Sequence, residues 1–298
     1  MGKLIFNIFK VNSSYLRVVA ILFLNNLTSI FLASLISSCA VEEYIDIPNT
    51  GEQKIVVFSI ISPGDSLFVE VNYSTNLNEW TDSQTSRVSD AIVTLHNEEG
   101  KSTALTFDQN RSIYFGSQEN LPIEAGKIYI LKIATQKGET LIATCQVPEA
   151  SAVWSNLTKT KIVEAGIEFF RINGTWDGLP ESPGYTVFIE STDELENGIT
   201  YSRKYEAKYW EISRVQNYYS FQRLLPSNTL VRADFSLITM DSNLHSFNLA
   251  TIPYKEFIDL NRADIINSFK GVYPAYTNIE GGVGVFGAYL RDTLSIKF

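Results

Sequence analysis

Cys39 is the residue whose surroundings most clearly predict a chemical modification. It follows Ser37 and Ser38 at the end of an apolar run over 18–36, and the segment 1–38 carries three basic residues and no acidic one. A basic start, an apolar stretch, small residues and then cysteine are the order of a bacterial lipoprotein signal peptide. The Cys39 thiol would accept diacylglycerol and its freed amine a further acyl chain, and two or more chains anchor a protein stably.

These features predict a signal peptide over 1–38, lipidation at Cys39 and a lipidated tether over 39–53. The alternative is an uncleaved helix that spans the membrane, because the apolar run is interrupted only by Asn25 and Asn26. The cysteine at the point where the apolar run ends favours the signal peptide.

A glycine pattern near the end of the chain could be read as a cofactor site. Residues 282–287 satisfy G-x-G-x-x-G. A dinucleotide site needs this pattern between a strand and a helix, with an acidic residue about twenty positions further on. The chain ends before that position, so we predict no cofactor and expect Gly284 and Gly287 to permit close packing or positive φ.

The remaining reactive side chains form no recognisable catalytic or metal motif. His96 and His245 are the only histidines, and neither has a second His or Cys at ligand spacing. Asp193 and Asp241 could ligate calcium, but no D-x-D-x-D-G loop contains them. We therefore predict no catalytic residue and no metal site, although paired carboxylates of a glycosidase are not identifiable from sequence. Cys145 alternates as a strand residue and is expected to be buried.

An aromatic cluster is the most suggestive feature of the second half of the chain. Among its members, Tyr209, Trp210 and Tyr219 are our candidates for a contact surface, because exposed Tyr and Trp bind sugars, peptides and partner proteins well. The alternative is that these rings form sheet core and cross-strand pairs.

The net negative charge of the chain limits which classes of partner it is expected to bind. The net charge is −9, and removal of the basic leader would change it to −12. Nucleic acid and anionic lipid both require clustered Lys and Arg, so neither is an expected partner.

The elements that would position these residues are mainly strands. Short β-branched runs with turn residues between them predict an immunoglobulin-like β-sandwich over 54–148. A second β-rich domain is expected over 153–298, with one amphipathic helix near 253–268 that Pro253 would begin. The predicted interior of the first domain is formed by alternating strand residues: Val57, Val69, Val93, Leu95, Tyr129 and Leu131.

Several segments taken together resemble one family. They are Ile55-Val56-Val57, Ile61-Ser62-Pro63-Gly64-Asp65, the run from Val88 to Leu95, the run from Gly126 to Leu131, and the glycine-rich run from Thr277 to Tyr289. In this order after Cys39, they resemble the Bacteroidetes outer-membrane lipoproteins described as domain of unknown function 4249. The resemblance covers nearly the whole mature chain, with a looser match over 154–240. The family has no established enzymatic activity that the resemblance could imply for this chain. The resemblance does imply a role beside a TonB-dependent transporter.

The leading hypothesis is a non-enzymatic lipoprotein of the outer membrane that binds a ligand or assists a TonB-dependent transporter in nutrient uptake. The ligand stays unknown, and the protein could face the cell surface or the periplasm. Glu42 and Glu43 just after Cys39 resemble a surface-export signal and favour the cell surface. A lipid-anchored hydrolase of glycan or peptide and a structural adhesin are the alternatives.

Replacement of Cys39 tests the anchor. Cys39→Ala should block lipid attachment and leave an unprocessed precursor, because the lipoprotein peptidase acts only before a lipidated cysteine. Palmitate labelling and the mobility of the chain on a gel measure both effects. Labelling of the variant at the wild-type level would contradict the prediction.

Overall fold

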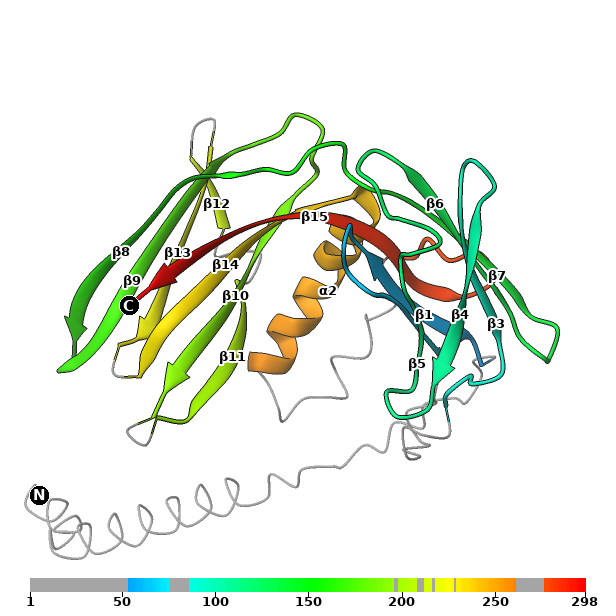
Figure 1. Cartoon of the computed structure of the whole chain (residues 1–298), viewed down its shortest axis with the longest axis horizontal. Coiled ribbons are helices and arrows are strands. Elements are labelled where there is room, and N and C mark those ends of the chain that lie inside the picture. The colour runs from blue at the N-terminus through cyan, green and yellow to red at the C-terminus, as the bar shows by residue number, and fades with distance from the viewer. Residues whose placement is uncertain are drawn as a thin grey trace, which may run out of the picture. The chain divides into compact units, whose positions relative to one another are not determined.

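The structure is a computed structural model that describes residues 53–74, 86–195, 198–207, 212–215, 218–227, 229–260 and 276–298 (Figure 1). Over 252–260 only the backbone is described. The predicted signal peptide, Cys39 and most of the tether lie outside the described residues.

The described part of the chain is mainly β, as predicted. Its elements in chain order are β1 (Ile55–Ile61), β2 (Leu67–Tyr73), β3 (Ile92–Asn97), β4 (Ser102–Asp108), β5 (Ile113–Gly116), β6 (Ile128–Ala134), β7 (Thr140–Gln146), β8 (Trp154–Glu164), β9 (Ile167–Asp177), β10 (Tyr185–Glu194), β11 (Thr200–Ala207), β12 (Ile212–Val215), β13 (Tyr218–Pro226), β14 (Leu230–Met240), the helix α2 (Ser242–Leu260) and β15 (Val283–Lys297). Among the described residues, no helix has the length and apolar character that crossing a membrane requires.

The first core is built mainly from strands β1 to β7, and along β1 and β7 every second side chain is buried. This period of two is what a strand with one buried face produces. All six residues predicted to lie inside are at most 2 % exposed: Val57, Val69, Val93, Leu95, Tyr129 and Leu131. Cys145 is likewise buried, as expected.

Strand β15 joins sequence regions that are far apart. It pairs in parallel with β1 and antiparallel with β14, within the strand order β11-β10-β14-β15-β1-β2-β5-β4-β3-β6-β7. Figure 1 shows β15 in red between these neighbours. Phe286 is buried in the first core, whereas Ile296 near the other end of the strand packs on the second. Residues 51–298 form one compact unit, and the predicted boundary near 148–153 stays a prediction.

The second core lies between strands β10, β11 and β14 of the large sheet and the four-stranded sheet β12-β13-β9-β8, and it is rich in aromatic rings. Trp154 meets Trp176 edge to face with ring centroids 5.3 Å apart, a favoured aromatic geometry. The Trp154 Nε1–H also donates to the Phe235 carbonyl at 3.2 Å. These contacts fix how β8 and β9 cover β14.

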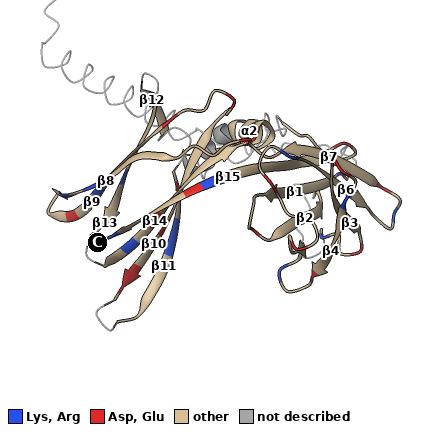
Figure 2. Cartoon of the chain, turned by 45° about the horizontal axis from the view of Figure 1, so that its top comes forward, with Lys and Arg blue, Asp and Glu red and all other residues tan. Residues whose placement is uncertain are grey.

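Charged residues of both signs lie on the strands around the second core (Figure 2), and some of them form ion pairs. Asp193 is 1 % exposed and accepts two hydrogen bonds from the Arg203 guanidinium, at 2.7 and 3.0 Å. Burial alone would raise the pKa of Asp193, but hydrogen bonds from Arg203, Thr229 and Ser191 hold it below its usual value. Asp193 is therefore a paired structural carboxylate.

The helix begins earlier than the sequence predicted. It starts at Ser242, not near Pro253, so the predicted start was wrong. Asp241 caps this end, since its Oδ1 accepts a hydrogen bond from the Leu244 N–H at 2.8 Å. Leu244 packs against β14 and β15, and the ring centroids of Phe247 and Phe58 lie 6.1 Å apart. Packing against the strands thus stabilises the helix between Ser242 and Pro253, where the apolar residues of the sequence do not repeat at helical spacing. The part of the predicted helix beyond Leu260 lies outside the described residues.

The Pro-Gly-Asp turn after β1 is tied to β15. The Tyr289 hydroxyl donates to Asp65 Oδ2 at 2.6 Å, and Arg291 pairs with Asp65 Oδ1 at 2.5 Å. Burial and the neighbouring Asp65 raise the pKa of Tyr289 to about 12, so this phenol remains a donor at neutral pH. Two of the segments that carry the family resemblance, Ile61–Asp65 and Thr277–Tyr289, therefore contact each other.

The glycine-rich segment is structural, as predicted. Gly284 has φ +123°, and a Cβ there would lie 1.9 Å from the Val57 carbonyl oxygen. At Gly287 a Cβ would lie 2.9 Å from the Leu244 Cβ. The first glycine allows β15 to approach β1, and the second allows α2 to lie on β15.

Gly284→Ala should destabilise the chain by about 3 kcal/mol, because a Cβ must push β1 and β15 apart. Gly100→Ala is the matched control. Gly100 also has positive φ, but a Cβ at this position would have no described atom within 4 Å. It should cost about 1 kcal/mol from backbone strain alone. Thermal unfolding of the purified variants measures the difference, and equal melting temperatures would contradict a steric role for Gly284.

Candidate functional site

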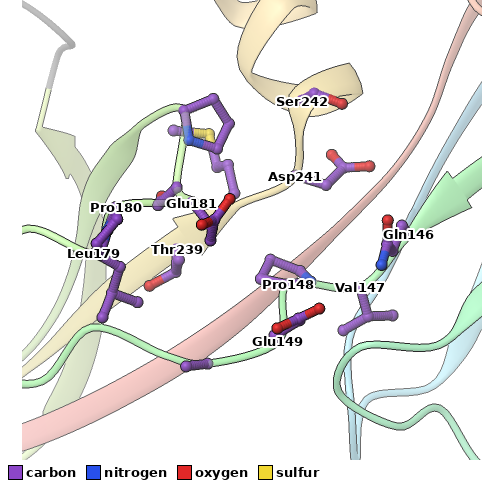
Figure 3. A pocket seen from close by; sticks show the side chains of 14 residues that line it. Gln146, Val147, Pro148, Glu149, Leu179, Pro180, Glu181, Thr239, Asp241 and Ser242 are labelled. Atoms are coloured by element: carbon purple, nitrogen blue, oxygen red, sulfur yellow. The ribbon is translucent and has the colours of Figure 1, made fainter.

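A cavity of about 670 Å³ lies where three distant segments meet. They are residues 146–150 after β7, the turn 179–183 between β9 and β10, and residues 239–242 where β14 leads into α2. Figure 3 shows these side chains converging on one space. The volume is within the usual range for small-molecule sites.

Hydrogen bonds hold the walls in place. The Leu179 N–H donates to the Tyr185 hydroxyl at 2.6 Å, and the Met240 N–H donates to the Gly184 carbonyl at 3.2 Å. On the side of β7, the Ala152 N–H donates to Thr239 Oγ1 at 2.9 Å. Prolines at 148, 180 and 183 further restrict these segments. The cavity is therefore formed without a ligand.

Asp241 is the most unusual group in the wall. The residue is only 6 % exposed. Its Oδ1 caps α2, whereas its buried Oδ2 has no hydrogen-bond partner in the described part of the chain. Burial raises the pKa of Asp241 to about 6, against the opposing effect of the backbone hydrogen bonds with Leu244 and Ala288. At neutral pH this group is a desolvated carboxylate.

The cavity is acidic and partly apolar. Glu149, Glu181 and Asp241 line it, and no Lys, Arg or His is among the described lining residues. Val147, Leu179 and Met240 supply apolar surface. Such a wall favours a ligand that combines positive charge with an apolar body.

The groups behind Asp241 fix the helix start against β7. Asn243 donates to the Thr144 carbonyl at 2.8 Å, and the Tyr276 hydroxyl donates to Asn243 Oδ1 at 2.6 Å. Burial raises the pKa of the Cys145 thiol well above its usual value, with a further contribution from Asp241. Cys145 therefore stays a protonated, buried thiol with little nucleophilic reactivity.

Of the candidate contact residues, only Tyr219 is described, and it is not among the described residues that line this cavity. Tyr209, Trp210 and Cys39 lie outside the described residues. Tyr219 is half-buried and stacks on Trp176 with ring centroids 5.8 Å apart and planes 9° apart. Its role at a contact surface stays a prediction, while its role in packing is clear.

The histidines lie in separate places. His96 is on β3 beside Thr94, and His245 is on the first turns of α2. Within the described ranges, no group of three or more His, Cys, Asp and Glu residues is arranged to hold a metal ion.

The cavity was not predicted from the sequence. Of its walls, the sequence had pointed only to position 148, as the predicted end of the first domain, and to Asp241, as a possible calcium ligand outside any calcium-binding loop motif. One local feature could have indicated the helix start beside the cavity: Asp241, before Ser-Asn-Leu, is a favoured N-cap residue.

The raised pKa of Asp241 predicts a pH-dependent effect on stability. The pKa rises from 3.8 to about 6 on folding, so the ionised form at higher pH opposes folding. Asp241→Asn keeps a capping oxygen and should become more stable relative to wild type as pH rises from about 4 to about 7, by up to about 3 kcal/mol. Denaturant unfolding at both pH values measures this gain. Glu149→Gln, at an exposed position, is the control and should show little change; an Asp241→Asn difference that is equal at both pH values would contradict the raised pKa.

Comparison with known proteins gives a family and no function. No curated protein matches the chain. Among solved structures, one chain titled "Cytokine receptor complex - Crystal form 1A" matches with 10% identity and a TM-score of 0.24, covering 63% of this chain and 86% of that chain. Nothing about this protein follows from so distant a likeness. The sequence model of Domain of unknown function (DUF4249) matches residues 41–295. Because this match spans most of the sequence, the chain belongs to the DUF4249 family.

Proposed function

We propose that this chain is a non-enzymatic, lipid-anchored protein of the outer membrane that binds a ligand in association with a TonB-dependent transporter. The observation that carries the proposal is the preformed cavity of about 670 Å³ beside Asp241. Its size and mixed apolar and polar lining suit a small ligand.

The chemistry of the lining favours retention of a ligand over its turnover. Ser182 and Ser242 line the cavity, but the described lining contains no histidine that could activate either hydroxyl. Glu149 and Glu181 are exposed on the wall and are suited to attracting charge.

The anchor is proposed from the N-terminal sequence. Lipidation at Cys39 would hold the protein at a membrane through two or three acyl chains. The tether 39–53 would then connect this anchor to β1, which begins at Ile55. A protein held in this way would keep its cavity close to a transporter in the same membrane, and would raise the local concentration of the ligand there.

Two aromatic variants test the association with a transporter. Trp210→Ala should reduce co-purification of the transporter from detergent-solubilised outer membrane and leave the melting temperature unchanged. Tyr219→Ala should lower the melting temperature, because it removes the ring that stacks on Trp176. Both variants are compared with wild type for bound transporter and thermal unfolding.

Absence of any TonB-dependent transporter from the wild-type complex would contradict the proposed association. Retention of the transporter by Trp210→Ala together with a lower melting temperature would place Trp210 in the protein's own packing. The contact surface would then lie elsewhere.

A further inference from the structure

We propose that strand β11 binds an extended, acidic polypeptide segment of a partner protein, which pairs with the open side of β11 as an additional strand. The side chains that would recognise this segment are Tyr201, Arg203, Tyr205, Arg214 and Arg223, together called the β11 edge. The inference goes beyond the proposed function, because it requires neither a ligand in the cavity nor a lipid anchor.

The first observation is that β11 ends the large sheet without a neighbour. It lies last in the strand order, and among the described residues no strand pairs with its outer side. The strand at the other end of the same sheet, β7, is covered. Ile142 pairs there with Glu280. The Asn278 side chain donates to the Thr144 carbonyl at 3.1 Å. An uncovered edge presents N–H and C=O groups with which an extended peptide can pair.

The second observation is a local reversal of charge. Residues 200–226 contain five Lys and Arg against two Asp and Glu, whereas the whole chain has a net charge of −9. Arg203 and Lys204 lie on β11 itself (Figure 2, blue). An acidic partner would therefore be attracted to this part of the chain and repelled by most of the remaining surface.

The third observation is that tyrosine rings position the arginines of the β11 edge. The Arg203 Cζ lies 5.2 Å from the centroid of the Tyr201 ring. The Arg223 Cζ, on β13 of the facing sheet, lies 5.8 Å from the centroid of the Tyr205 ring. Cations at this distance are attracted to the ring face. Because the guanidinium groups are already positioned, less side-chain entropy is lost when an anionic partner binds.

Arg214 adds a third guanidinium group from β12, the edge strand of the facing sheet. It is exposed and lies directly opposite Tyr219, with its Cζ 5.9 Å from the ring centroid. Tyr219 packs on the second core, so Arg214 is on the face of its sheet that is turned toward the large sheet. Arg203 is already bound by the buried Asp193 carboxylate, which leaves Arg214 and Arg223 as the residues to test.

The open strand distinguishes a polypeptide from other polyanions. A peptide in extended conformation repeats N–H and C=O groups at the spacing of a β-strand, which a sugar chain or a nucleic acid does not. Every second side chain of the added strand would lie on the face that carries Tyr201, Arg203 and Tyr205. Carboxylates at alternate positions would therefore meet the guanidinium groups, and such charge-assisted hydrogen bonds are strong.

Four probes test the class of partner. A labelled peptide, Thr-Glu-Thr-Glu-Thr-Glu-Thr, is titrated into the full chain in detergent at pH 7.5 and followed by fluorescence anisotropy. The same peptide with Lys in place of Glu should bind at least about tenfold more weakly, because its charge is repelled. The acidic peptide with alternate backbone nitrogens methylated should also lose at least about tenfold, because it cannot donate to β11. Polygalacturonate, an anionic sugar chain, should not displace the acidic peptide at equal carboxylate concentration.

Hydrogen exchange on the wild-type chain locates the bound peptide without any substitution. The amides of Thr200–Ala207 should exchange more slowly when the acidic peptide is bound, because those on the open side of β11 become hydrogen-bonded. The amides of β7, at the other end of the sheet, should exchange as they do without peptide.

Two arginine variants test the side chains of the β11 edge. Arg214→Gln and Arg223→Gln each remove one charge and one ring contact, and the double variant should weaken binding of the acidic peptide at least about tenfold. Arg111→Gln is the matched control. The Arg111 Cζ lies 4.5 Å from the centroid of the Phe115 ring, away from the second core, and this variant should bind the peptide as wild type does.

Several outcomes would overturn the proposal: no binding of the acidic peptide, equal binding of its methylated form, displacement by polygalacturonate, unchanged hydrogen exchange in β11, or wild-type affinity in the double variant. Displacement by polygalacturonate would assign the β11 edge to an anionic glycan. None of these outcomes would affect the proposed cavity ligand or lipid anchor, which have separate tests.

Discussion

Strands β1 and β15 lie side by side in parallel, with Val57 opposite Gly284, and this pairing connects the two ends of the described chain. It can form only because Gly284 brings no Cβ against the Val57 carbonyl oxygen. On one face of β15, Phe286 and Ala288 complete the first core. Further along the same strand, backbone pairing with β14 leads to the second core. The largest sheet therefore depends on a contact between residues more than two hundred positions apart, which local sequence preferences cannot supply.

The same strand positions the candidate site. The Asp241 N–H donates to the Ala288 carbonyl at 3.0 Å, and Gly287 leaves room for the first turn of α2 at Leu244. Asp241 is thus held at the junction of β14, β15 and α2, where one carboxylate oxygen caps the helix and the other is buried without a hydrogen-bond partner in the described residues. A change at Gly287 would disturb both the helix start and the cavity wall, although Gly287 does not line the cavity.

Local sequence patterns predicted the features that depend on neighbouring residues. Alternation identified buried residues such as Val93 and Leu131, and the glycine pattern at Gly284 was correctly read as packing. The helix start was missed because the first turn of α2 is stabilised by the packing of Leu244 on β14 and β15, and not by a long apolar repeat within the helix sequence. The cavity was missed for the same reason: its walls at Pro148, Leu179 and Asp241 come together only after the sheets form. Periodicity along the chain carries no information about such distant contacts.

Two buried carboxylates, Asp193 and Asp241, differ in how completely they are hydrogen-bonded. Asp193 is 1 % exposed and is paired with Arg203, Thr229 and Ser191, so its ionised form is stabilised. Asp241 is 6 % exposed, yet only one of its oxygens has a hydrogen-bond partner in the described residues, and its ionised form is disfavoured. A capping role alone would be met by Asn or Ser without this cost. Positions where a sequence keeps a locally unfavourable group are expected to be functional sites. The contrast with Asp193 therefore marks Asp241 as a buried carboxylate whose unfavourable effect on folding is not explained by capping alone.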